Sequence, residues 1–405
     1  MSSDAQLARS ADAKAAKKGT HPQSSAGGPD SEDDQQSNND GESLYDIVLN
    51  RQVIVCCGSG GVGKTTTAAI LALEAARMGR NSVVVTIDPA RRLADALGID
   101  QLSNEPSEIQ GKWPGSVHAM MLDTKATFDG LVRRYAASEE QAEEILQNTF
   151  YKNISGALSG TQEYMASEKL YELAEESEFD LVVVDTPPTR NALDFLEAPH
   201  RLAQFLDHRL YKVLMTPTRG IARAVNVAAQ TALKSISKVV GGDVIGDAIS
   251  FFQAFEGMEQ GFKERAMHVN TLLLADETAF VLIATPKADT VAEAGYFADK
   301  LHELGIAVRA LVVNRMQPVF GRESDGGATA PAAARARAET LEGSDVADYY
   351  TCLADSRELA IGESEHLQGL TDQIAPAPVI LVEVQPVEVN DLAALETLGT
   401  VMVRR

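Results

Sequence analysis

The chain has 405 residues, of which 44% are hydrophobic, and carries a formal net charge of −22 at pH 7. This charge argues against non-specific nucleic-acid binding, which depends on Lys and Arg, and against docking on an anionic membrane through a basic helix. Since no apolar run approaches the length of a membrane span and no apolar signal core follows Met1, we expect a cytoplasmic protein without direct membrane insertion.

The composition along the chain predicts a polar tail followed by one α/β domain. Residues 1–43 are rich in Ser, Asp, Asn and Gln, which is typical of a disordered acidic tail. Within residues 44–405, strand-like apolar runs alternate with helical stretches, and the runs lie at 53–57, 82–87, 117–122, 181–184, 279–284, 310–313 and 378–384. This alternation predicts an α/β fold with a mainly parallel, doubly wound sheet covered on both faces.

Three segments interrupt the alternation. Two of them, at about 124–178 and 200–276, lack strand character and are long insertions in the alternating pattern. The third, at about 321–338, is rich in Gly, Ala, Ser and Arg and predicts a mobile loop.

Residues 58–65 form a complete G-x-x-x-x-G-K-[ST] phosphate-binding loop between a predicted strand and a predicted helix. A glycine-rich turn without a ligand is the alternative, and the flanking strand and helix disfavour it. Lys64 would reach the β- and γ-phosphates, and the Thr65 hydroxyl would bind Mg²⁺. We therefore predict that ATP and Mg²⁺ are the cofactors, bound by Gly58, Ser59, Gly60, Gly61, Val62, Gly63, Lys64, Thr65 and Thr66.

Two aspartates follow predicted strands and favour hydrolysis of the nucleotide. Asp88 ends the run at 82–87, and from the tip of a parallel strand it could orient or deprotonate the attacking water. Asp185 ends the run at 181–184 in the manner of a Walker B element and would hold Mg²⁺, through a water. The alternatives are a helix N-cap for Asp88 and a turn residue for Asp185.

These motifs resemble those of the arsenite-pump (ArsA) and tail-anchored-protein-targeting ATPases, a family of the deviant Walker A class of P-loop NTPases related to MinD and ParA. The resemblance rests on Gly58–Thr66, Asp88–Ala90, Asp185–Thr189 and Leu311–Asn314. It implies an ATP-hydrolysing dimeric switch in which Asn314 reads adenine. The resemblance also implies that the insertions at about 124–178 and 200–276 form a helical subdomain, which would bind an apolar helical client or a membrane-protein partner.

Departures from the family pattern bear on catalysis and assembly. Ser59 stands where the family has a lysine that reaches the partner's phosphates, so a homodimer of this chain would lack that cation. Ser59 therefore favours a heterodimer with a related, lysine-bearing ATPase over a homodimer. Arg91, Arg92 or Arg190 could supply the charge instead, or be solvated switch-loop residues. The alternative function is an ATP-binding regulatory subunit with weak hydrolysis of its own.

Two further patterns concern the interior. The three cysteines, Cys56, Cys57 and Cys352, include no C-x-x-C pair, so neither the family's zinc site nor a metalloid site is expected. Phe251, Phe255, Met258 and Phe262 lie on one face of a predicted helix. This stripe is either part of a core or an exposed client surface.

Overall fold

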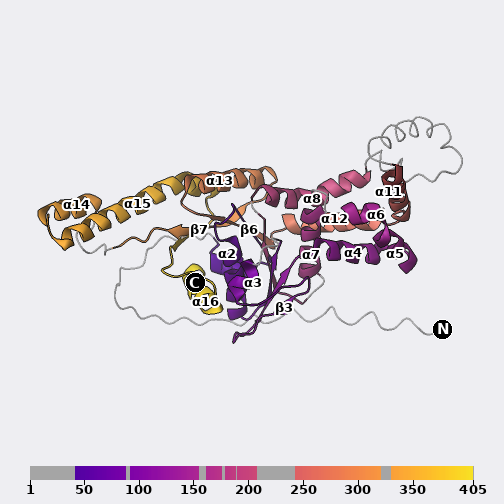
Figure 1. The fold of residues 1–405 in the computed structure, drawn as a ribbon, viewed down its shortest axis with the longest axis horizontal. Coiled ribbons are helices and arrows are strands. Elements are labelled where there is room, and N and C mark those ends of the chain that lie inside the picture. The colour runs from indigo at the N-terminus through magenta and orange to yellow at the C-terminus, as the bar shows by residue number, and fades with distance from the viewer. Residues whose placement is uncertain are drawn as a thin grey trace, which may run out of the picture. The chain divides into compact units, whose positions relative to one another are not determined.

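A single eight-stranded sheet organises the domain (Figure 1), in the order β3-β4-β2-β5-β1-β6-β7-β8. The computed structural model describes residues 42–87, 92–154, 161–175, 178–187, 189–207, 242–320 and 330–404. Its strands are β1 (Val53–Gly58), β2 (Asn81–Thr86), β3 (Ser107–Glu108), β4 (Ser116–Met121), β5 (Leu181–Asp185), β6 (Thr278–Ala284), β7 (Val308–Met316) and β8 (Val379–Glu383). Every described pairing is parallel except that of β3 with β4, which confirms the predicted mainly parallel α/β sheet.

Alternate residues of each strand face opposite sides of the sheet, and helices cover both. In β1, Ile54 and Cys56 belong to one core and Val53, Val55 and Cys57 to the other. The first core is covered by α1 (Leu44–Asn50), α2 (Lys64–Arg77), α3 (Arg92–Leu97) and α16 (Leu392–Met402). The second is covered by α7 (Thr161–Glu175), α8 (Thr189–Asp207), α12 (Glu259–Leu274), α13 (Ala288–Glu303) and α15 (Asp345–Ile374).

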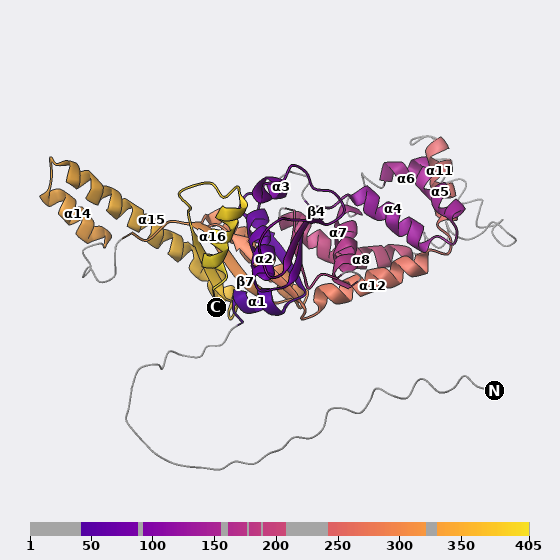
Figure 2. The same ribbon diagram turned by 90° about the horizontal axis from the view of Figure 1, so that it is seen from below.

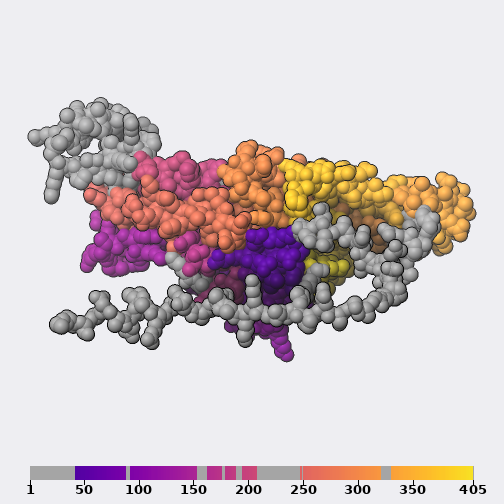
Figure 3. Space-filling model, turned by 180° about the vertical axis from the view of Figure 1, so that it is seen from behind, coloured from indigo at the N-terminus to yellow at the C-terminus, as the bar shows by residue number. Residues whose placement is uncertain are grey.

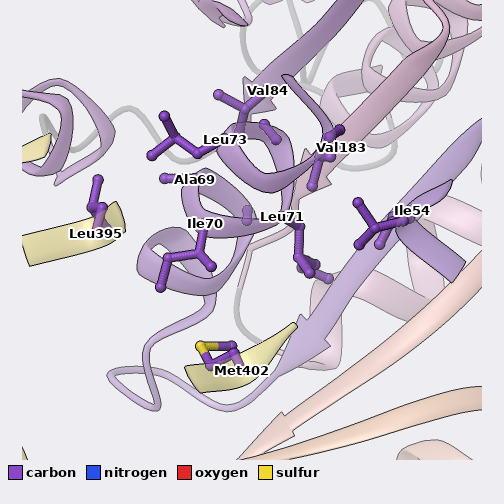
Figure 4. Packing of buried hydrophobic residues seen from close by; sticks show 14 of the residues in the cluster. Ile54, Ala69, Ile70, Leu71, Leu73, Val84, Val183, Leu395 and Met402 are labelled. Carbon is purple, nitrogen blue, oxygen red and sulfur yellow. The ribbon is translucent and has the colours of Figure 1, made fainter. Parts of the chain in front are cut away.

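Helix α2, which follows the phosphate-binding loop, is buried along most of its length. Its alanines allow a close approach to the strands, and its larger side chains fill the space between sheet and α16. Figure 4 shows this packing for Ile54, Ala69, Ile70, Leu71, Leu73, Val84, Val183, Leu395 and Met402. The helix is therefore fixed relative to the sheet, and its N-terminus is held at the carboxyl ends of the strands.

Helices from two distant parts of the sequence form a third core. They are α4 (Thr124–Tyr135), α5 (Glu139–Gln147), α6 (Thr149–Ile154) and α11 (Gly242–Ala254), together with parts of α7, α8 and α12. Phe251, Phe255, Met258 and Phe262 are all buried here, so the apolar stripe is core. The single helix predicted for them is wrong, because α11 ends at Ala254 and α12 begins at Glu259, with a turn at 255–258 between them. Neighbouring rings explain why: Phe251 packs against Phe150 of α6 with the ring centroids 5.6 Å apart. Residues 208–241 of the predicted insertion lie outside the described part.

Helix α14 (Pro331–Thr340) runs back along α15 (Figure 2). The predicted mobile loop at 321–338 thus differs from the structure in its second half, since residues 331–338 are helical. Pro331 in the first turn and an Ala-rich sequence favour a helix there. Figure 3 shows α13 between α12 and α15 on the face seen from behind. Residues 321–329, like 1–41 of the predicted tail, lie outside the described part.

Among the described residues, no helix is both long and apolar enough to cross a membrane.

Candidate nucleotide-binding site

The phosphate-binding loop connects the carboxyl end of β1 to the N-terminus of α2, which begins at Lys64. At two positions of this loop glycine is required, because neighbouring atoms lie too close to leave room for a Cβ. A Cβ on Gly58 would lie 2.1 Å from the carbonyl oxygen of Ile283, and one on Gly63 would lie 2.3 Å from Asn314 Nδ2. Gly63 also has φ +102°, a left-handed conformation that side chains disfavour. The loop therefore presents its backbone N–H groups and the helix N-terminus to one cavity.

Lys64 is the buried cation of this loop. Its Nζ donates a hydrogen bond to the carbonyl oxygen of Ser59 at 2.9 Å, so the side chain folds back over the loop. Burial lowers the pKa of Lys64, although the carboxylate of Asp185 opposes the shift. A bound anion such as phosphate would favour the charged form of Lys64 and so raise its pKa again.

Asp185 joins the loop to the neighbouring strand. Its Oδ2 accepts hydrogen bonds from Thr65 Oγ1 at 2.7 Å and from Thr86 Oγ1 at 3.0 Å, and the residue is 1% exposed. Mg²⁺ prefers hydroxyl, carboxylate and water oxygens. Both Thr65 and Asp185 line the cavity, so the donor set fits the ion predicted from the sequence.

Asn314 contacts the loop from the end of β7. Its Nδ2 donates to the carbonyl oxygen of Val62 at 3.0 Å, and its Oδ1 accepts from the backbone N–H of Arg315 at 2.9 Å. The side chain also lines the cavity. Its position is compatible with contact to a base; adenine reading remains a prediction.

These groups surround a cavity of about 800 Å³. Arg92, at the start of α3, lines it and lies close enough to Lys64 to oppose protonation of that lysine. Another wall of the cavity, formed by residues 383–390 at the end of β8 and directly after it, was not predicted to belong to the site. The sequence gives no strand order, so it could not place β8 beside β7 at this edge. Arg315 also lines the cavity and was likewise not predicted.

Several predicted site residues lie outside the described part. Asp88 and Arg91 are among them, and so is the side chain of Arg190. Ile87, the last described residue before Asp88, accepts a hydrogen bond from Gln162 Nε2 of α7 at 3.2 Å. The segment that contains Asp88 therefore starts beside both Asp185 and α7, because the backbone N–H of Ile87 also donates to the carbonyl oxygen of Asp185 at 3.1 Å.

Ser59 and the adjacent cysteines are buried. Ser59 is 7% exposed, and its Oγ has no hydrogen-bond partner within the described residues. Burial raises the pKa of the Cys56 thiol and raises that of Cys57 to about 12, so neither is a reactive thiolate near neutral pH. The described residues contain no group of three or more His, Cys, Asp or Glu arranged to hold a metal ion.

Residues 51–351 match the family of anion-transporting ATPases. The ATPase GET3 of Malassezia globosa is 26% identical over 260 residues, which span 64% of this chain and 71% of that protein. The ATPase ASNA1 homolog of Dictyostelium discoideum is 27% identical over 260 residues, 64% of this chain and 70% of that protein. The ATPase get3 of Aspergillus terreus is 26% identical over 273 residues, 66% of this chain and 74% of that protein.

Proposed function

The chain belongs to the anion-transporting (ArsA-type) ATPase family and is an ATPase, and we propose that it works as a dimeric switch whose helical subdomain responds to ATP hydrolysis. The observation that carries the site assignment is the 2.7 Å hydrogen bond between Thr65 and Asp185. It brings a phosphate-loop hydroxyl and a strand-end carboxylate together beside Lys64. This is the arrangement that a magnesium–triphosphate complex requires.

In the proposed reaction, Lys64 exchanges its hydrogen bond to Ser59 for the β- and γ-phosphate oxygens. Thr65 and, through a water, Asp185 would hold Mg²⁺, and the ion would supply positive charge beside those oxygens. Asp88 orients the attacking water and accepts its proton. A bond forms from the water oxygen to the γ-phosphorus, the bond to the β–γ bridging oxygen breaks, and ADP and phosphate leave.

The base lies at the other end of the cavity in this proposal. Asn314 contacts its edge, because an amide can both donate to and accept from adenine. The wall at 383–390 includes Val384, Pro386, Val387 and Val389, which give the base an apolar surface.

A contiguous set of contacts supports coupling between the site and the helical subdomain. Helix α7 contacts Ile87 through Gln162 and, further along the same helix, carries Glu168. Glu168 Oε1 accepts a hydrogen bond from Arg265 Nε of α12 at 2.6 Å, with both side chains buried. Helix α12 also contributes Phe262 to the third core. A movement of the segment after Ile87 would therefore displace α7 and, through it, α12.

For assembly, we propose a dimer with a related ATPase that keeps the loop lysine, since Ser59 cannot provide a cation. The three similar proteins named above are all called ATPases, which favours an active enzyme over a weakly hydrolysing regulatory subunit. The client would be an apolar helix or a membrane protein, bound by the helical subdomain. Arg92 supplies a competing source of charge within this chain.

Phosphate release by the purified protein tests the enzyme. Lys64→Ala should abolish tight ATP binding in calorimetry, whereas Lys112→Ala, at an exposed lysine outside the cavity, should not. Asp88→Asn should keep ATP and Mg²⁺ binding but slow turnover about 10²–10⁴-fold, since an amide cannot act as a base. Asp100→Asn, at an exposed aspartate, is its control. Unchanged ATP affinity in Lys64→Ala would refute the site, and equal turnover in Asp88→Asn would refute the role of Asp88.

A further inference from the structure

Arg315 has an unusual backbone conformation at the edge of the cavity. Its φ is 64°, and within the described residues it is the only non-glycine residue with positive φ. The β7–β8 register shifts at the same point, since Asn314 pairs with Val382 and Met316 with Glu383, leaving Arg315 without a partner strand residue. Left-handed backbone is unfavourable for a residue with a Cβ, and such strain concentrates at functional sites.

The bulge places two consecutive side chains in one cavity. In a regular strand, residues 314 and 315 would point to opposite faces of the sheet. Here both Asn314 and Arg315 line the cavity. The guanidinium of Arg315 makes no hydrogen bond or ion pair with the described residues, so the folded chain itself does not account for its orientation.

Sheet order indicates which part of a nucleotide Arg315 would meet. Along the carboxyl edge the strands run β5, β1, β6, β7, β8, with Asp185 on β5 and the phosphate loop after β1. Arg315 on β7 is two strands beyond β1, roughly 10 Å at the usual strand spacing, and on the side away from Asp185. The apolar residues Val384, Pro386 and Val387 line the cavity on this same side, after β8. A nucleotide whose phosphates lie on the loop would place its base here.

We propose that Arg315 packs its guanidinium over the face of the nucleotide base and holds the base against the apolar side chains of the wall at 383–390. This proposal rests on the proposed ATP site and adds a residue to it. A planar, weakly hydrated guanidinium stacks on aromatic rings, whereas a lysine ammonium does so less well. Stacking recognises any purine face, so Arg315 contributes affinity for the base, and discrimination between bases is left to edge contacts such as that of Asn314.

Nucleotide affinities of Arg315→Ala test the contact. Dissociation constants for ATP, ADP and AMP would be measured by calorimetry, with competition for the weaker ligands. We expect each to rise by about the same factor, roughly 5- to 100-fold, because the three ligands share the base. Arg315→Ala should weaken the binding of ATP and of GTP by the same factor. Arg315→Lys should recover only part of the lost affinity. Arg309→Ala, on the same strand but paired with Asp276, is the matched control and should bind like the wild type.

Other outcomes are equally informative. A loss that grows from AMP to ATP would show a phosphate contact and overturn the proposal, as would unchanged affinity. If wild type itself fails to bind ATP, the proposed function fails; if wild type binds and Arg315→Ala binds equally well, only the base contact fails.

Thermal unfolding of Arg315→Gly separates binding from architecture. Glycine adopts positive φ without strain, so we expect a Tm at or above that of the wild type together with weakened ATP binding. A lowered Tm with unchanged binding would assign Arg315 a structural role and overturn the proposal.

Discussion

Gln162 Nε2 donates a hydrogen bond to the carbonyl oxygen of Ile87 at 3.2 Å, which attaches the first turn of α7 to the residue that precedes Asp88. Ile87 follows β2, which lies two strands from β1 and its phosphate loop, because β2 neighbours β5 and β5 neighbours β1. In the proposed coupling, this backbone oxygen is the contact through which a change at the γ-phosphate would reach α7.

Replacing Gln162 by Ala should weaken this coupling without removing nucleotide binding, because the side chain does not line the cavity. Hydrogen exchange measured with and without ATP is the readout. In the wild type we expect ATP to change the protection of α7 and α12; in Gln162→Ala the change at α12 should shrink. Gln147→Ala, on the exposed surface of α5, serves as the control. An unaltered ATP response at α12 in Gln162→Ala would exclude this contact as the route.

The pair Glu168–Arg265 should dominate the stability of the junction between α7 and α12. Its side chains are 2% and 5% exposed, and the guanidinium lies over the ring of Tyr171 at 4.1 Å. Removing one member of a buried ion pair leaves an uncompensated charge, so Glu168→Ala should lower the free energy of unfolding by about 3–5 kcal/mol. The double replacement Glu168→Leu with Arg265→Met should be less damaging than the single one, because no charge remains buried. Urea titrations of the wild type, Glu168→Ala and the double variant check this order. A double variant that is less stable than Glu168→Ala would contradict it.

ATP binding should be coupled to proton uptake at alkaline pH through Lys64. Burial lowers the pKa of this lysine in the nucleotide-free protein, and phosphate oxygens would raise it again. Between these two values the free protein has lost the proton that the complex keeps, so binding takes one up and affinity falls as pH rises. In the same window the unfolded chain binds more protons than the folded one, so the stability of the nucleotide-free protein rises towards the ordinary lysine pKa of about 10.4. Calorimetry in buffers of different ionisation enthalpy measures the uptake; none at any alkaline pH would contradict the assignment.

The sequence predicted the seven strands that carry apolar runs. Burial on both faces explains the runs of β1, β5 and β6, whereas β8, at the edge of the sheet, keeps its apolar run although most of it is only partly buried or exposed. It missed β3, whose two residues Ser107 and Glu108 are exposed and carry no apolar pattern. The phosphate loop, Thr65 and Asp185 come together as expected, since motifs at the carboxyl ends of parallel strands share one edge. Their catalytic roles remain predictions.

Other parts of the site could not be found in this way, for two physical reasons. Strand order is set by packing between distant segments, so the sequence did not show that the wall at 383–390 faces the loop. The bulge at Arg315 depends on pairing between β7 and β8, and a single arginine after an apolar run gives no sign of it. Similarly, the spacing of Phe251 and Phe255 predicted one helix face, but α11 ends at Ala254 and the chain turns there. The spacing also could not show the helices from residues 124–154 that bury these rings.

Ser59→Lys tests where the cation that this phosphate loop lacks comes from. Ser59 is buried, but its Oγ makes no hydrogen bond within the described residues, so the replacement removes no polar contact there. In the proposed dimer, a lysine at this loop position would have to leave the buried site of Ser59 to reach the partner's phosphates. If assembly with a lysine-bearing ATPase supplies the charge in nature, the wild-type chain alone should turn over slowly. A Ser59→Lys homodimer would then place a cation at both sites; a comparable arginine finger given in trans is worth about 10³–10⁵ in rate, so the increase should be large. Ser107→Lys, on the exposed edge strand β3, adds the same charge elsewhere and should leave the turnover unchanged.

Fast turnover by the wild-type chain alone, unaltered in Ser59→Lys, would instead assign the cation to this chain. Arg92→Ala should then slow the reaction, because Arg92 already lines the cavity beside Lys64.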